Sequence, residues 1–131
     1  MSTEVLGSLP ESMAKVLSGI ANLGVLSSPL VVTGKSGVRH TFTFGVGSTE
    51  SPKVACDVVL GTAPVDETKV LSLFIKVYDV GAKNSILCVA PSLTPDAKKL
   101  SNLYKILVVE AQAESEILSR LSELLQRMAT T

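Results

Sequence analysis

The sequence contains few of the residues that usually form chemical sites. It has no tryptophan, three phenylalanines, two tyrosines, two cysteines and one histidine. Cys56 and Cys88 are too few and too far apart for a four-ligand zinc site or a CxxC redox motif. Both lie in apolar runs, as buried structural cysteines do. So few aromatic side chains also argue against a protein that binds single strands by stacking their bases.

An excess of charge of either sign is also lacking. Twelve lysines and arginines balance twelve aspartates and glutamates, which excludes a strongly basic nucleic-acid-binding surface but not a local basic cluster. No apolar run reaches the ~18 residues that a membrane-spanning helix needs. Residues 1–12 lack the basic start and apolar core of a secretory signal. We therefore expect a soluble cytoplasmic protein with no membrane partner.

The apolar sequence that is present suffices for one folded domain. The chain has 131 residues, of which 46% are hydrophobic, and a mean hydropathy of +0.40. A chain of this length can bury a substantial core. It contains no internal repeat and no low-complexity segment, so we expect a single domain over residues 1–131.

The N-terminal half predicts one helix followed by three strands. The helix is expected over about Leu9–Leu23, because apolar residues recur there at helical spacing. Ser8 and Glu11 have the spacing of a capping box at its start. The strands are expected at Leu30–Thr33, Val38–Val46 and Val54–Leu60.

The second and third of these strands carry the most informative residues. The second alternates in part, which places His40, Phe42 and Phe44 on one face. The third is almost continuously apolar, as in a strand that is covered on both sides. Asp57 interrupts that run, and a buried carboxylate at this position requires a partner.

The C-terminal half predicts helices that alternate with strands. Val70–Val80 fits both periodicities, but a helix is favoured because a parallel crossover needs about a dozen residues. Asp66 and Glu67 also suit a helix start, and Gly81 suits a helix end. The remaining elements are a strand at Ile86–Ala90, a helix opened by Thr94, Pro95 and Asp96, a strand at Ile106–Glu110 and a helix at Ser115–Met128. This order predicts an α/β fold with a mixed sheet of about five strands and helices on both faces.

One segment of the N-terminal half resembles a known motif. Gly34–Thr43 reads GKSGVRHTFT, which resembles the G-x-S-G-x-x-H-x-F-D motif of small archaeal and bacterial members of the restriction-endonuclease-like superfamily, the PD-(D/E)XK nucleases. The order of elements over Leu9–Glu110 is similar to the core of that superfamily. Residues 77–83 resemble the end of its second helix, and residues 93–100 and 104–106 resemble a later helix and strand. The resemblance implies a three-layer α/β/α fold and a metal-dependent nuclease site.

The sequence departs from that motif at two positions that carry chemistry. Thr43 stands where the superfamily has a metal-binding acid, and a neutral hydroxyl is a poor ligand for a hard cation such as Mg²⁺. Asp57 keeps the acid of the following acid-x-Lys pair, but Val59 takes the place of the lysine. That lysine would stabilise charge on the phosphate, which valine cannot do. The resemblance therefore implies a degenerate nuclease.

An alternative catalytic cluster remains open. The superfamily resembled here can move its lysine to the following helix, where Lys76 lies, and Glu11 on the first helix is a second acid. Asp57, Lys76 and Glu11 would then surround one Mg²⁺ or Mn²⁺, with Asp57 as the metal ligand. The competing interpretation is that Glu11 caps its helix and Lys76 faces water.

Candidate nucleic-acid-binding residues gather around the resembling segment. They are Lys35, Ser36, Arg39, His40 and Lys53. The same charges also fit solvated loops. In addition, Lys35 or Lys53 is the expected partner of the Asp57 carboxylate.

Two other enzyme classes are excluded by spacing. Gly34-Lys35-Ser36 is not a phosphate-binding loop, because that pattern needs a glycine where Pro29 stands. The sequence has no G-x-S-x-G nucleophile elbow with which His40 would form a hydrolase triad. We expect His40 to pack beside Phe42.

Together these observations predict a degenerate nuclease-fold protein that binds nucleic acid or a partner protein without cleaving, and without a cofactor. The alternative is an active Mg²⁺- or Mn²⁺-dependent endonuclease. The apolar stripe of the last helix covers the sheet or, in a second interpretation, extends across a subunit boundary. Because related nuclease folds tend to pair, the resemblance also implies a homodimer.

Overall fold

The computed structural model describes residues 4–19, 25–48, 50 and 52–130. Its strands are β1 (Glu4–Val5), β2 (Leu26–Ser27), β3 (Leu30–Thr33), β4 (Arg39–Phe42), β5 (Phe44–Gly47), β6 (Pro52–Leu60), β7 (Asn84–Ala90) and β8 (Leu107–Glu110). The main sheet has the order β2-β5-β6-β7-β8, and β1 also pairs with β6. β6, β7 and β8 are parallel to one another. β1 and β5 each pair antiparallel with β6, and β2 pairs antiparallel with β5. The expected mixed sheet is confirmed.

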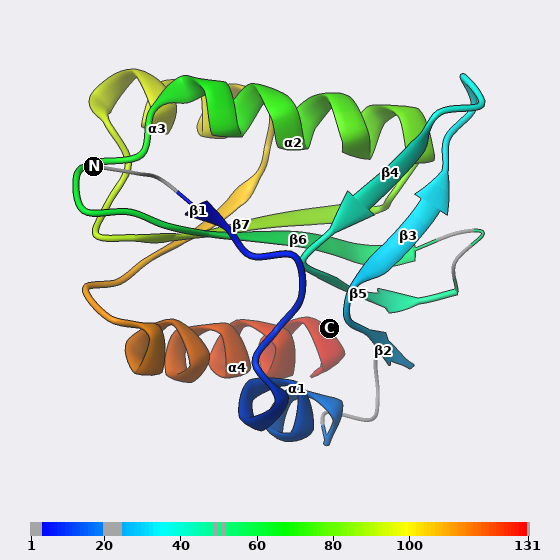
Figure 1. Ribbon diagram of the computed structural model, residues 1–131, viewed down its shortest axis with the longest axis horizontal. Coiled ribbons are helices and arrows are strands. Elements are labelled where there is room, and N and C mark those ends of the chain that lie inside the picture. Colours follow the sequence, from blue (N-terminus) through cyan, green and yellow to red (C-terminus); the bar gives the residue numbers. More distant parts are fainter. Residues whose placement is uncertain (1–3, 20–24, 49, 51, 131) are drawn as a thin grey trace.

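Helices cover both faces of the main sheet (Figure 1). α2 (Glu67–Val80) and α3 (Pro95–Leu103) lie on one face, and α1 (Glu11–Ser18) and α4 (Glu114–Thr130) lie on the other. The expected three-layer α/β arrangement is therefore confirmed. No helix in the described part of the chain combines the length and the apolar character needed to cross a lipid bilayer.

The apolar run of β6 serves two separate cores. Cys56 and Val58 point to the core formed with α1 and α4, while Ala55 and Val59 point to the core formed with α2 and α3. Every one of these side chains is at most 1% exposed. A strand between two helical layers has no solvent face, which explains why its sequence does not alternate.

The single strand expected over Val38–Val46 is wrong. The chain forms β4 and β5, separated by Thr43. β4 pairs with β3 in a separate two-stranded sheet, whereas β5 joins the main sheet. Phe42 and Phe44 therefore fill opposite cores instead of one face, because the chain changes sheets between them.

The ends of α2 and α3 follow the expected signals. Asp66 is the N-cap of α2 and accepts a hydrogen bond from the backbone N–H of Thr68. Gly81 ends the helix with a φ of +72°, a conformation that favours glycine. Thr94 caps α3 by accepting a hydrogen bond from the N–H of Ala97. These helix boundaries confirm the helical interpretation of the ambiguous segment.

α1 is shorter than the expected first helix. It begins at Glu11 with Pro10 as its N-cap and has no side-chain cap, so the expected capping box of Ser8 and Glu11 is wrong. Pro10 is extended, with a ψ of 147°, which places Ser8 two residues too early to cap the helix. α1 ends at Ser18, and residues 20–23 of the expected helix lie outside the described residues.

Candidate functional site

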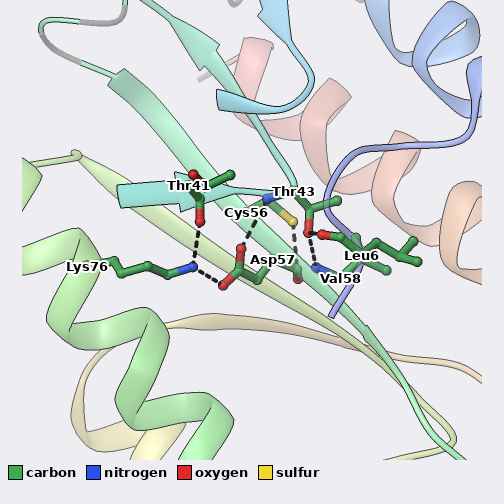
Figure 2. A network of polar contacts seen from close by, with 7 residues as sticks. All are labelled: Leu6, Thr41, Thr43, Cys56, Asp57, Val58 and Lys76. Carbon is green, nitrogen blue, oxygen red and sulfur yellow. Dashed lines mark hydrogen bonds and ion pairs between the residues drawn. The ribbon is translucent and has the colours of Figure 1, made fainter. Parts of the chain in front are cut away.

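Asp57 lies in the middle of β6 and points toward α2 (Figure 2). It is 4% exposed. Its Oδ1 accepts a hydrogen bond from the backbone N–H of Thr43 at 3.1 Å, and its Oδ2 accepts one from Nζ of Lys76 at 2.6 Å. Both carboxylate oxygens are therefore engaged within the protein, and the buried charge has an opposite charge beside it.

Lys76 is held in place by further contacts. Its Nζ also donates to the backbone carbonyl of Thr41 at 2.8 Å and lies 4.8 Å from the centroid of the Phe42 ring. The expectation that Lys35 or Lys53 pairs with the carboxylate is wrong. α2 crosses the face of β6 that carries the carboxylate, so the partner comes from this helix.

The hydroxyl of Thr43 is hydrogen-bonded to the backbone of two other strand segments. Its hydroxyl donates to the backbone carbonyl of Leu6 at 2.6 Å and accepts from the backbone N–H of Val58 at 3.1 Å. β5 pairs with the first part of β6 and β1 pairs with its end, so the hydroxyl bridges the stretch between them. The hydroxyl thus satisfies the carbonyl of Leu6 and the N–H of Val58, beside the backbone bond that the N–H of Leu6 donates to the carbonyl of Val58.

Glu11 is not part of this cluster. It is exposed at the start of α1, which packs on the face of the sheet opposite to α2 (Figure 1). The prediction that Glu11 joins Asp57 and Lys76 in one cluster is therefore wrong, whereas Asp57 and Lys76 do form an ion pair. Within the ranges that the structure describes, no group of three or more His, Cys, Asp or Glu side chains is arranged to hold a metal ion.

A second polar network joins the β3–β4 hairpin to α2. Asp79 accepts hydrogen bonds from the backbone N–H of Ser36 at 3.0 Å and from its hydroxyl at 2.6 Å. Nε2 of His40 lies 2.7 Å from Oδ2 of the same carboxylate. The hydrogen bonds from Ser36 and then His40 lower the pKa of Asp79 to about 2. Ser36 and His40 were expected to bind nucleic acid, but their polar groups contact Asp79.

Gly34 allows the hairpin to approach α2 closely. A Cβ at this position would lie 2.0 Å from Oδ2 of Asp79. The backbone N–H of Lys35 also donates to the backbone carbonyl of Asp79, at 2.9 Å. The Gly-x-Ser part of the resembling motif therefore attaches the hairpin to the helix.

Exposed cations collect at one edge of the sheet. Because β6, β7 and β8 are parallel, their N-terminal ends lie at the same edge, where Lys53, Lys83 and Lys105 are found. The hairpin adds Lys35 and Arg39, and all five residues are exposed. Within the described part of the chain, none of the five forms an ion pair. We name these five residues the basic edge.

Acidic residues collect at the opposite edge, where the parallel strands end. The helices that follow these strands carry acids in their N-cap or first turn, namely Asp66, Glu67, Asp96, Glu114 and Glu116. There they complement the positive ends of the helix dipoles. The last turns of α2 and α3 carry no basic residue. A chain with no net charge thus separates its charges through its topology.

The two cysteines are buried neighbours, as expected. Cys56 and Cys88 are both 0% exposed, and their Sγ atoms lie 3.8 Å apart without a disulfide bond. Burial raises the pKa of the Cys56 thiol well above its ordinary value. A protonated buried thiol is a poor nucleophile, so these residues serve packing.

Sequence reasoning missed three residues of these networks: Asp79, Lys83 and Lys105. Asp79 stands three residues after Lys76, so the two share one flank of α2. Lys83 and Lys105 precede apolar strands in the same way that Lys53 begins one. A lysine at the start of each of three strands that run parallel would have predicted a cluster of lysines at one edge of the sheet.

Comparison with known proteins supports the fold alone. No family model and no curated protein sequence matches the chain. A solved structure, the crystal structure of the protein of unknown function AF1548, is similar with a TM-score of 0.58 and 13% sequence identity. The similarity covers 85% of this chain and 67% of that chain. At this identity, the chain is similar to AF1548 in its three-layer α/β architecture.

Proposed function

We propose that this protein is a degenerate member of the restriction-endonuclease-like superfamily that binds nucleic acid through the basic edge and does not cleave it. The observation that carries the proposal is the closed ion pair between Asp57 and Lys76, at 2.6 Å. The protein would act in the reducing cytoplasm, where Cys56 and Cys88 remain thiols.

The surroundings of Asp57 support the loss of cleavage. A divalent cation such as Mg²⁺ takes several oxygen ligands, among them carboxylates. Among the residues that the structure describes, no group of three or more such side chains is arranged to hold a metal, and both oxygens of Asp57 already accept hydrogen bonds, one of them from a cation. Thr43 stands where the resembled motif has a metal-binding acid, and its hydroxyl is hydrogen-bonded to the backbone of Leu6 and Val58. This set of donors does not fit a hard divalent cation, so we derive no metal-dependent step.

The charge distribution supports binding to phosphates. The basic edge gathers Lys35, Arg39, Lys53, Lys83 and Lys105 without a competing ion pair within the described residues. Each phosphate contact contributes about −0.9 to the slope of log affinity against log salt concentration. About five such contacts would give a slope of about −4.5, so duplex binding should be modest and should weaken several-hundred-fold between about 50 and 200 mM salt.

Fluorescence anisotropy with a labelled DNA duplex at low and at near-physiological salt tests this proposal. We expect binding at low salt that weakens strongly at higher salt. Lys53→Glu combined with Lys83→Glu should abolish it, whereas Lys98→Glu combined with Lys99→Glu makes the same charge change at the acidic edge and should preserve it. Absence of low-salt binding would refute the proposal, and a defined protein co-purifying without nucleic acid would instead support a partner protein.

The contact between Lys76 and Asp57 also favours a second candidate, an active endonuclease whose lysine has moved to α2. This candidate requires Mg²⁺- or Mn²⁺-dependent cleavage that is lost in Asp57→Ala. Incubation of the purified protein with plasmid, single-stranded and structured substrates separates the two candidates. Intact substrates with both metals would exclude the enzyme.

We further propose that the protein forms a homodimer through β8. This strand is the last in the order of the main sheet, and its sequence, LVVE, has no lysine or proline to protect an edge. Leu107 is 40% exposed. Antiparallel pairing of two copies would continue the sheet across a two-fold axis. Light scattering should show a dimer that Leu107→Lys converts to a monomer, and a monomeric wild type would contradict this proposal.

A further inference from the structure

Three aromatic side chains from α2 and the end of α3 lie in a row that runs from the edge of the core to the surface. The rings of Phe74 and Tyr104 are stacked, with centroids 4.0 Å apart and an interplanar angle of 17°. The ring of Tyr78 lies 6.1 Å from that of Phe74. Phe74 and Tyr104 are half-buried, whereas Tyr78 is 76% exposed, so the ring of Tyr78 is the part of the row that is open to a ligand. We name these three residues the aromatic row.

The aromatic row lies beside the basic edge. Lys105 directly follows Tyr104, and Lys83 follows Tyr78 just beyond the end of α2. Both helices end where the parallel strands β7 and β8 begin, which is the edge that carries the exposed lysines. An open aromatic surface next to positive charges therefore results from the packing of α2 against α3.

We propose that the aromatic row binds unpaired bases of single-stranded nucleic acid. This inference rests on the proposed function and specifies its ligand. A base stacked on Tyr78 would extend the row, while the adjoining phosphates contact Lys83 and Lys105. Stacking of this kind tolerates any base, because every base presents a π face.

The chemistry of the surroundings selects this ligand over an apolar protein surface. Ile75 and Leu103, which are 60% and 69% exposed, provide an apolar contact area of their own. An apolar partner would leave the ammonium groups of Lys83 and Lys105 without anionic acceptors, whereas a nucleic-acid strand supplies both aromatic faces and phosphates. The low aromatic content of the sequence argued against base stacking, but the fold gathers three of the five aromatic residues in one place.

The experiment compares a labelled oligodeoxythymidylate with a labelled duplex of equal length by fluorescence anisotropy. Tyr78→Leu keeps an apolar side chain but removes the ring, and should weaken single-strand binding about tenfold or more while leaving duplex binding unchanged. Tyr78→Phe keeps the ring and should bind like the wild type. Leu103→Ala is the matched control for a merely apolar contact and should also bind like the wild type.

A second readout follows from the absence of tryptophan. The intrinsic emission comes from Tyr78 and Tyr104, so a stacked base should quench it, and Tyr78→Phe should remove most of that quenching. If Tyr78→Leu binds the single strand normally, or Leu103→Ala weakens binding equally, the aromatic row is not a stacking surface, even though duplex binding persists. If neither nucleic acid binds, the proposed function itself has failed.

Discussion

The ammonium group of Lys76 occupies the space beside Asp57 in which a positive charge is required. Its Nζ lies 2.6 Å from the carboxylate, and the carbonyl of Thr41 and the ring of Phe42 hold it there. Asp57 is buried, and the Lys76 side chain is 17% exposed. The pair supplies from within the chain the charge balance that a bound cation would otherwise provide, which links the stability of β6 to the packing of α2.

Removal of Lys76 should destabilise the protein. Lys76→Met keeps most of the apolar stem but leaves a buried carboxylate without its opposite charge, so we expect a loss of about 3 kcal/mol in the free energy of unfolding. Urea denaturation followed by circular dichroism measures it. Lys76→Met combined with Asp57→Asn should recover much of the loss, because the amide oxygen still accepts from Thr43. An unchanged unfolding midpoint in the single variant would show that the ion pair is not formed in solution.

Thr43 should matter through its hydroxyl and not through charge. Thr43→Val preserves the shape but leaves the carbonyl of Leu6 and the N–H of Val58 without this partner, so we expect a loss of about 2 kcal/mol in the free energy of unfolding. Thr41→Val is the control, since Thr41 is exposed and contributes its backbone carbonyl to the network. Urea denaturation of both variants gives the comparison, and equal midpoints would contradict the bridging role.

Asp79 should make the stability depend on pH in the acid range. Its pKa falls from 3.8 in the unfolded chain to about 2 in the fold, so the folded state holds its proton less tightly. The stabilisation is therefore present above pH 3.8 and is lost as the pH falls toward about 2. Asp79→Asn should lower the urea midpoint at neutral pH and lose most of that difference near pH 2. A constant difference across this range would rule out the predicted linkage.

Gly34 should not tolerate a side chain. In Gly34→Ala, the new Cβ would overlap the Asp79 carboxylate, which Ser36 and His40 hold in place. The hairpin would have to move away from α2, with a loss of about 1–3 kcal/mol in the free energy of unfolding. Gly7→Ala is the control, because a Cβ there meets no atom within 4 Å. Thermal unfolding of both variants tests this, and equal melting temperatures would be inconsistent with the close approach.

Much of the architecture was available from local signals. Asp66, Gly81 and Thr94 act at the helix ends as their residue types predict, since capping depends on neighbours in the chain. The continuous apolar character of β6 predicted its burial on both faces. The break at Thr43 was not predictable in this way. There the Thr43 hydroxyl joins the carbonyl of Leu6 to the N–H of Val58, and both residues are distant from Thr43 in sequence.

The sequence by itself determined most helices and strands, because periodicity is a local property. It also determined that a buried strand carries Asp57, and that Thr43 and Val59 stand where the resembled motif has an acid and a lysine. The tertiary structure alone decided that Lys76 meets Asp57 while Glu11 lies on the other face of the sheet. It also decided that scattered lysines share one edge and that the aromatic row forms. These juxtapositions depend on strand direction and helix packing, and the same residue spacings permit several such arrangements until the chain is folded.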